Sequence, residues 1–267
     1  MTTLRELSDM RGRRVLITGA TGHLGRVIAE TVAEMGASIL LLDRPGSDFV
    51  SLEKSLVDRW GVGVESIECD LEFEGQRESA IERVKRDGKG LNCLVNNAAF
   101  VGTAELGGWS TRFEEQSLAT WRRAMEVNLT APFHLCQGLA PQLKSSRGGN
   151  IVNITSIYAD HGPDWRLYQG TSMGNPAAYG ASKAGLAQLT RWLATTLAPN
   201  VRVNAISPGG IARGQPEVFS TRYIEKTLGN RMATEDDFRG AIGYLVSDQS
   251  AYVSGETLRV CSGWGSW

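Results

Sequence analysis

Short apolar runs recur along the chain and alternate with longer segments in which apolar residues return every three or four positions. The first pattern predicts buried strands, and the second predicts amphipathic helices. We expect strands near residues 13–18, 37–43, 64–70, 91–96, 149–156, 200–206 and 256–261. Helices are expected near residues 24–36, 49–60, 74–88, 117–145, 176–198 and 234–247. This alternation predicts an α/β fold of the Rossmann type, a doubly wound parallel sheet of about seven strands with helices on both faces.

Composition agrees with one compact domain and excludes several classes of partner. The chain has 267 residues, of which 42% are hydrophobic, so a single domain over residues 1–267 can bury a sizeable core. The net charge is −1 without any block of like charge, which argues against a nucleic acid partner. No apolar stretch approaches the length of a membrane span, and residues 1–10 lack the apolar core of a signal peptide. We therefore expect a cytoplasmic protein without a membrane partner.

Cysteine and histidine are spread singly along the chain. The four cysteines show no paired spacing and sit in apolar surroundings, which predicts free buried thiols. The three histidines are equally scattered, so the sequence predicts no metal site.

A glycine-rich turn follows the first predicted strand and leads into the first predicted helix. Gly19, Gly22 and Gly25 have the spacing of a dinucleotide-binding turn. Glycines let the backbone approach a pyrophosphate, and the free N–H groups at a helix N-terminus bind it. The next predicted strand ends in Asp43, which is placed to hydrogen-bond an adenosine ribose. A carboxylate there favours NAD over NADP, although the guanidinium of Arg44 could receive a 2′-phosphate instead.

Tyr179 stands four residues before Lys183 inside a predicted helix, and Ser156 closes an earlier apolar run. Positions i and i+4 share one helix face, so we expect the ammonium of Lys183 beside the phenol. A nearby cation favours phenolate and lowers the pKa of the tyrosine from its free value of about 10. Tyr179 could then exchange a proton with a substrate hydroxyl while Ser156 hydrogen-bonds the same oxygen. Taken alone, the spacing also suits an amphipathic helix with a solvated lysine.

With these motifs the chain resembles the short-chain dehydrogenase/reductase family, in its common single-domain branch, over nearly its whole length. The matching segments occur in the family's order: Thr18-Gly19-x-x-Gly22-x-x-Gly25, Asp70-Leu71, Asn96-Asn97-Ala98-Ala99, Asn128, Ser156, Tyr179 with Lys183, and Ser207-Pro208-Gly209. The resemblance implies a catalytic tetrad of Asn128, Ser156, Tyr179 and Lys183, in which Asn128 supports a proton relay through water. The alternative for Asn128 is a polar residue that kinks a helix near Pro132.

The resemblance also implies how the cofactor is held. It assigns the glycine turn to the pyrophosphate, Asp43 to the adenosine ribose, Asp70 to the adenine and Lys183 to the nicotinamide ribose. The residues expected to contact NAD are Gly19, Thr21, Gly22, His23, Leu24, Gly25, Asp43, Arg44, Asp70, Leu71, Asn97, Ala98, Ala99, Tyr179, Lys183, Pro208, Gly209 and Ile211. A homodimer or homotetramer is implied as well, with the helices at 117–145 and 176–198 packed against their symmetry mates.

The chain departs from the family pattern in three places. Gly22 and His23 give the glycine turn the form of the nucleotide-sugar-modifying branch, and His23 could either pack beside the pyrophosphate or be a solvated turn residue. Ala99 replaces a family glycine but is small enough to let the cofactor pass. Arg213 replaces the threonine that often contacts the nicotinamide carboxamide, which leaves that contact open.

Three extensions, near residues 100–117, 157–176 and 212–231, are expected to enclose the substrate cleft. The segment 157–176 joins Ser156 to the helix of Tyr179, so it must rise beside the substrate. Its polar and aromatic side chains suit a hydroxylated ligand, and the alternative is a self-packing loop or a subunit contact. The candidate substrate residues are Tyr158, His161, Trp165, Arg166 and Tyr168 of this segment and Arg213 of the third extension.

The sequence therefore predicts an oxidoreductase that transfers a hydride between NAD(H) and a secondary alcohol or ketone. The chain is also similar to a subgroup of this family associated with bacterial surface-sugar and flagellin-glycan pathways, which implies a polar, sugar-like substrate. The similar residues are Ser156-Ile157-Tyr158, Tyr168-Gln169-Gly170-Thr171-Ser172-Met173, Pro176 and the closing Gly263-Trp264-Gly265-Ser266-Trp267. Two alternatives stay open. One is a nucleotide-sugar epimerase or dehydratase, suggested by the glycine turn, and the other is a catalytically idle NAD-binding sensor or assembly subunit.

Overall fold

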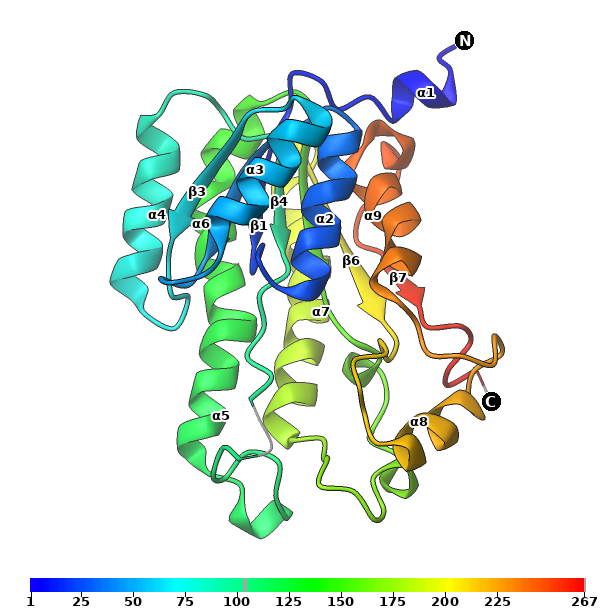
Figure 1. Cartoon of the computed structure of the whole chain (residues 1–267). Helices are drawn as coiled ribbons and strands as arrows, with labels where there is room; N and C mark the ends of the chain where they lie inside the picture. The colour runs from blue at the N-terminus through cyan, green and yellow to red at the C-terminus, as the bar shows by residue number, and fades with distance from the viewer. Residues whose placement is uncertain (103–104, 267) are drawn as a thin grey trace.

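Figure 1 shows the computed structural model, which describes residues 1–102 and 105–266. Within these residues, seven parallel strands form one sheet in the order β3-β2-β1-β4-β5-β6-β7. The strands are β1 (Arg14–Thr18), β2 (Ser38–Asp43), β3 (Val64–Glu68), β4 (Cys93–Asn96), β5 (Gly149–Ile154), β6 (Val201–Pro208) and β7 (Thr257–Val260). The strand order reverses at β1, and ligands of doubly wound sheets bind at such a switch point. The predicted fold class is confirmed.

Helices join the strands and cover both faces of the sheet. They are α1 (Leu4–Leu7), α2 (His23–Glu34), α3 (Phe49–Trp60), α4 (Glu74–Arg86), α5 (Leu118–Met125), α6 (Ala131–Ser145), α7 (Ala177–Leu197), α8 (Glu217–Ile224) and α9 (Arg239–Val246). The helix expected at 117–145 is interrupted by a π-helical turn, Glu126–Thr130. Position 267 and positions 103 and 104 of the extension expected at 100–117 lie outside the described residues.

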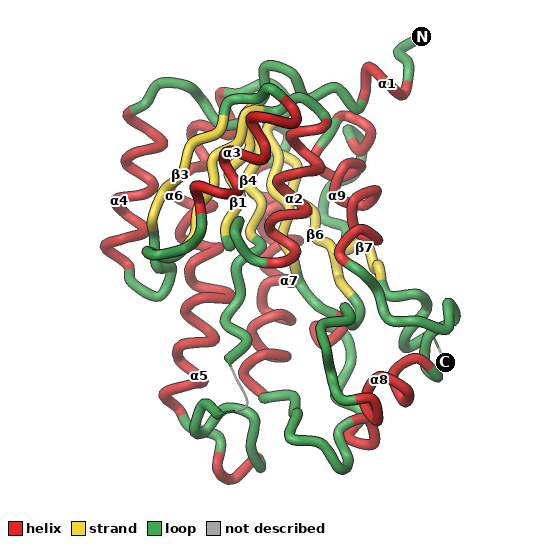
Figure 2. Tube along the Cα trace, in the orientation of Figure 1, coloured by secondary structure: helices red, strands yellow, loops and turns green. Residues whose placement is uncertain are grey.

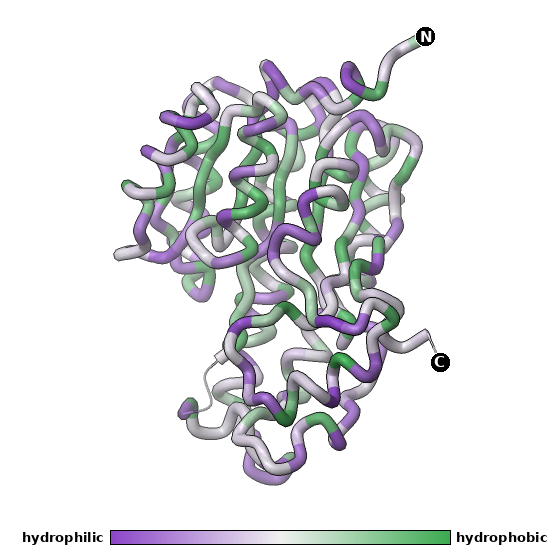
Figure 3. The backbone as a smooth tube through the Cα atoms, turned by 45° about the vertical axis from the view of Figure 1, so that its right-hand side comes forward, coloured by the Kyte–Doolittle hydropathy of each residue, from purple (hydrophilic) through white to green (hydrophobic). Residues whose placement is uncertain are grey.

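Two apolar layers arise because neighbouring strand residues point to opposite faces. Val15 and Ile17 of β1 pack with α2, α3 and α9, whereas Leu16 between them packs with α4, α6 and α7. Both sets of side chains are buried, so the strands read as continuous apolar runs, as expected for a parallel sheet. Figure 3 shows this hydrophobic interior and the more hydrophilic outer turns.

Beyond the carboxyl ends of the strands, the molecule extends into a second layer of loops. Figure 2 shows α5 and the first half of α7 projecting past the sheet, with α8 and connecting loops beside them. Ile157, Leu167, Phe219, Tyr223 and Trp264 form a separate apolar cluster there. Segment 157–176 is thus anchored through its own buried residues. No helix of the described chain is long and apolar enough to cross a membrane.

Candidate active site

The carboxyl edge of the sheet gathers the residues that sequence motifs single out. Gly19 follows β1, Asp43 ends β2, Asn97 follows β4, Ser156 follows β5 and Pro208 ends β6. Because all these strands are parallel, their carboxyl ends meet at one edge. The motifs are scattered over almost 200 positions of sequence, and the parallel topology brings them together.

Ser156 and Tyr179 line one cavity at this edge. Ser156 is buried, and its hydroxyl oxygen accepts the backbone N–H of Tyr158 at 3.2 Å, so its hydrogen can point elsewhere. Tyr179 lies in the first turn of α7, and Lys183 follows one turn later with 2% of its surface exposed. The Lys183 ammonium donates to the Ile154 carbonyl at 2.7 Å and lies 6.0 Å from the centre of the Tyr179 ring.

Burial shifts the two titratable groups in directions set by desolvation. It lowers the pKa of Lys183 to about 8, because the buried ammonium loses hydration. Burial also raises the pKa of Tyr179, opposed by hydrogen bonding with Ser156 and by the positive charge of Arg213. The sequence led us to expect a lowered pKa for Tyr179. The direction differs here because Lys183 lies against the ring and next to a carbonyl, while desolvation of the phenolate dominates.

Asn128 is fully buried inside the π-helical turn. Its side-chain oxygen accepts the Phe100 N–H at 2.6 Å, and its amide donates to the Phe100 carbonyl at 3.2 Å and to the Ser182 hydroxyl at 3.0 Å. These bonds join the loop after β4 to α7 next to Lys183. A π-helical turn often marks a functional position, and this one presents Asn128 to α7. Its part in a proton relay stays a prediction.

The glycine turn has the backbone shape that close approach requires. Gly19 has φ +62°, a left-handed conformation, and a side chain there would collide with Ala98. A Cβ at Gly25 would come within 2.0 Å of the Gly19 carbonyl oxygen. Asn97 holds the turn from the side, donating to the Thr18 and Gly19 carbonyls at 2.9 and 3.0 Å. Helix α2 begins at His23 without a side-chain cap or an acidic residue in its first turn.

Asp43 is bonded to the glycine turn across the end of β1. Its carboxylate accepts the Thr21 N–H at 2.9 Å and the Thr21 hydroxyl at 2.7 Å, while its other oxygen accepts the Arg44 N–H at 2.8 Å. Arg44 is exposed and lines a surface hollow together with Asp70. Leu71 is buried, and its carbonyl accepts a bond from the buried guanidinium of Arg77. His23 is exposed, whereas Leu24 is buried.

The cavity beside Tyr179 has a volume of about 350 Å³. From segment 157–176 it receives Tyr158 and Tyr168, whose hydroxyl oxygens lie 2.6 Å apart. Pro208 and Gly209 form another part of its wall, and Ile211 follows them with a bridge to Ala233. Ala99 lies between Ala98, whose N–H donates to the Thr18 hydroxyl, and Phe100, which bonds Asn128.

Four of the candidate substrate residues do not line this cavity. His161 packs against Trp264 with ring centres 5.5 Å apart. Trp165 is 56% exposed, and Arg166 is exposed and paired with Asp164. Arg213 is paired with Glu235 at 2.9 Å, although its charge is near enough to affect Tyr179. Segment 157–176 therefore turns Tyr158 and Tyr168 toward the cavity and Arg166 toward solvent.

Sequence reasoning missed several wall residues. They are Val101, Trp109, Ser110, Met173, Asn175, Gln215, Phe219, Tyr223 and Met232. All but Met232 fall within the three extensions predicted from the sequence. The sequence therefore located the segments that form the wall, but not the individual side chains that face the cavity. Which side chain of a loop points inward depends on the loop's packing, and no periodicity encodes it.

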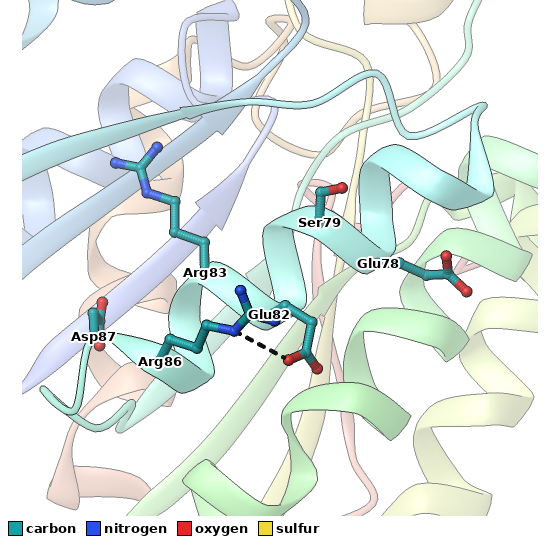
Figure 4. A pocket seen from close by; sticks show the side chains of 6 residues that line it. All are labelled: Glu78, Ser79, Glu82, Arg83, Arg86 and Asp87. Atoms are coloured by element: carbon teal, nitrogen blue, oxygen red, sulfur yellow. Dashed lines mark ion pairs between the residues drawn. The ribbon is translucent and has the colours of Figure 1, made fainter.

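A larger hollow of about 650 Å³ lies elsewhere, along α4. Figure 4 shows its six side chains spread along one helix, with Arg86 paired to Glu82. These are charged or hydroxyl side chains of a solvated helix face, and none of the motif residues lies there. Charges of both signs on an exposed helix are ordinary surface chemistry. The candidate site is the smaller cavity at Tyr179.

Comparison with known proteins agrees with this geometry. A family model described as enoyl-(acyl carrier protein) reductase matches residues 19–265, from the glycine turn to the C-terminal segment. The chain belongs to the short-chain dehydrogenase/reductase family. A curated relative, the probable galactose dehydrogenase GalD of Rhizobium meliloti (strain 1021), is 32% identical over 266 residues, covering 97% of this chain and 97% of the relative.

Solved structures of this family superpose over almost the whole chain. The NADPH-dependent 3-quinuclidinone reductase of Rhodotorula rubra has a TM-score of 0.88 and 26% identity, covering 100% of this chain and 96% of that one. An NAD⁺-bound xylitol dehydrogenase has a TM-score of 0.83 and 28% identity, covering 95% and 99%. Members of the family thus use either nicotinamide cofactor, and this chain is an oxidoreductase of that kind.

Proposed function

We propose that this protein is an NAD-dependent dehydrogenase that oxidises a secondary alcohol of a sugar-like substrate and reduces the ketone in the reverse direction. The observation that carries the proposal is the shared cavity of Ser156 and Tyr179 at the switch-point edge, with Lys183 buried beside the tyrosine. Similarity to a galactose and a xylitol dehydrogenase supports the substrate class. We also propose that the three extensions act as substrate loops, because each contributes to the cavity wall.

Each site residue has a definite task in this reaction. In oxidation, Tyr179 accepts the proton of the substrate hydroxyl, and Ser156 hydrogen-bonds the same oxygen. Lys183 is positioned by the Ile154 carbonyl to carry positive charge or release a proton next to Tyr179. Asn128 joins α7 to the loop after β4 and, under this proposal, supports the proton path. In reduction the same groups return the proton to the carbonyl oxygen.

The glycine turn fits a dinucleotide. The uncapped N-terminus of α2 leaves N–H groups for a pyrophosphate, and Gly25 has no space for a side chain. Asp43 retains free lone pairs for ribose hydroxyls, since a carboxylate has more acceptor sites than its three bonds use. A bound nicotinamide would supply the acceptor for the hydride of the alcohol carbon in oxidation and the hydride donor in reduction. Lys183, Asn97, Pro208 and Ile211 would hold its end of the cofactor.

The first experiment is a screen of sugars and polyols with NAD⁺, followed by nicotinamide absorbance. We expect stoichiometric NADH formation with at least one sugar or polyol. Redox-neutral conversion of a nucleotide sugar would instead identify the epimerase or dehydratase. Cofactor binding without turnover of any compound, in either direction, would favour the sensor or assembly subunit.

Cofactor choice is expected to depend on Asp43. NADH should bind at least ten-fold more tightly than NADPH, because about 1.4 kcal/mol of repulsion between the carboxylate and a 2′-phosphate suffices. Asp43→Asn keeps the acceptor for Thr21 but removes the charge, so the NADPH affinity should rise. Arg44→Gln is the matched variant and should leave NADH affinity unchanged. Equal wild-type affinities in a fluorescence titration would show that Arg44 binds the phosphate and overrides Asp43.

Three further expectations stay predictions. They are the surface-sugar subgroup, the cytoplasmic location and the homodimer or homotetramer. For the last, Leu118 of α5, Phe133 of α6 and Trp192 of α7 are exposed apolar side chains that a symmetry mate would cover.

A further inference from the structure

The cavity beside Tyr179 contains hydroxyl, amide and aromatic groups but no charged side chain. Among the described residues that line it, those with a hydroxyl or amide side chain are Ser110, Ser156, Tyr158, Tyr168, Asn175, Tyr179, Gln215 and Tyr223, and the others are glycine, proline, aliphatic, methionine and aromatic residues. A ligand enclosed there exchanges water for aromatic rings and neutral hydrogen-bonding groups. An ionised group without a partner is costly to bury in such surroundings.

Four cations carried by the elements that form the cavity wall already have partners. Arg166 and Lys226 both pair with Asp164 on the outer side of the loop, and Arg213 pairs with Glu235. Lys183 lies beneath Tyr179 and donates to a backbone carbonyl. Within the part of the chain that the structure describes, none of these cations lines the cavity to balance a phosphate or a carboxylate.

The Tyr158 and Tyr168 hydroxyls form the polar feature of the inner wall. One hydroxyl donates to the other at 2.6 Å, and Tyr158 also hydrogen-bonds with Asn175, so one hydroxyl hydrogen and the remaining lone pairs are left for a ligand. Burial raises the pKa of Tyr158 far above its usual value, so its hydroxyl stays neutral. The Tyr168 hydroxyl is also close enough to Tyr179 to affect its pKa. The pair is therefore a neutral donor and acceptor near the catalytic tyrosine.

We propose that the substrate is an uncharged polyhydroxy compound and that the Tyr158–Tyr168 pair binds a second hydroxyl of it, near the hydroxyl that reacts at Tyr179. This inference rests on the proposed dehydrogenase function and narrows its substrate class. Trp109, Phe219 and Tyr223 contribute aromatic, largely buried surface to the same wall, against which the C–H groups of a sugar could pack. The volume of about 350 Å³ lies at the small end for ligand pockets, which suits one monosaccharide-sized molecule.

The test compares related compounds with and without a negative charge. D-Galactose and D-glucose are measured beside their uronates and their 6-phosphates, together with xylitol and with cyclohexanol, which has a single hydroxyl. We expect kcat/KM for the preferred neutral sugar or polyol to exceed that of any anion by at least about 100-fold, because the anion finds no buried partner. A uronate or phosphate that reacts as well as the neutral compounds would overturn the proposal.

The hydroxyl pair is tested with Tyr158→Phe and Tyr168→Phe, which keep both rings. Each is expected to lower kcat/KM for the neutral sugar or polyol about ten-fold, the usual effect of one neutral hydrogen bond, while cyclohexanol changes less than about two-fold. Tyr244→Phe, a tyrosine of α9 on the other side of the molecule, is the matched control and should change neither. Equal losses on all substrates, or no loss at all, would show that the pair only supports the wall.

Binding gives a reading that does not depend on turnover. Tyr179→Phe is titrated with the same compounds in the presence of NADH, and quenching of tryptophan fluorescence is followed, since Trp109 lines the cavity. Selective binding of neutral polyols without wild-type turnover would overturn the proposed function and keep this inference. Turnover with a preference for anions would support the proposed function and overturn this inference.

Discussion

Tyr179→Phe is expected to lower kcat by about 10²–10⁴ while the affinity for NADH changes little, because the substitution removes a proton donor and acceptor but keeps the ring. The hydroxyl lies on the cavity with Ser156, and the ring packs beside Phe100 and Trp109. Steady-state kinetics with the preferred sugar or polyol measure the first effect, and NADH fluorescence measures the second.

The control for Tyr179→Phe is Tyr244→Phe, which also deletes one phenol oxygen but lies in α9 near the opposite apolar layer. It should keep both kcat and NADH affinity. Near-normal turnover by Tyr179→Phe would exclude this tyrosine as the acid and base. A loss of NADH binding as large as the loss of turnover would instead assign the phenol to cofactor binding.

Lys183→Met is expected to abolish most activity and yet stabilise the folded protein at pH 7. The pKa of Lys183 falls from 10.5 to about 8 because the ammonium is desolvated. A shift of that size corresponds to about 3 kcal/mol of destabilisation of the folded state while the lysine is charged. Loss of the bond to the Ile154 carbonyl offsets about 1–2 kcal/mol of the gain. The net expected change in the free energy of unfolding is about +1–2 kcal/mol, measured with urea.

The pH dependence distinguishes this cause from better packing. Between pH 8 and 10.5 the unfolded chain binds more protons at Lys183 than the folded chain. The destabilisation caused by the charged lysine is therefore lost as the pH rises, and the free energy of unfolding of the wild type increases. The advantage of Lys183→Met should therefore be complete below pH 8 and decline as pH increases toward 10.5. Lys144→Met, at an exposed lysine of α6, should show no such trend. An advantage that is the same at all pH values would point to packing.

The strands and the cofactor motifs could be predicted because they depend on local chemistry. Apolar runs such as Ile39 to Leu42 must be buried on both faces, and each predicted strand lies within a few residues of the observed one. Gly19 and Gly25 are required by a backbone that leaves no space for a side chain. The spacing of Tyr179 and Lys183 places both on one helix face regardless of the rest of the fold.

Loop orientation could not be predicted in the same way. Trp165 and Arg166 have the composition of ligand-binding residues, but their positions depend on Asp164, which pairs with Arg166 and with Lys226 after α8. Tyr168 points inward because Phe219 of α8 packs against its ring at 5.4 Å. The Asp164–Lys226 and Tyr168–Phe219 contacts join positions more than 50 apart, so no local pattern contains them.

By itself, the sequence determined the α/β class, the glycine-rich turn after β1 and the placement of Tyr179 and Lys183 on one helix face, since each depends on period, backbone space or i,i+4 spacing. Tertiary structure decided the environment of those groups. It buried Lys183 and lowered its pKa, desolvated Tyr179 and raised its pKa, and placed no charged side chain among the described residues of the cavity wall. Desolvation and pairing depend on every element packed around a site, and only the folded chain brings those elements together.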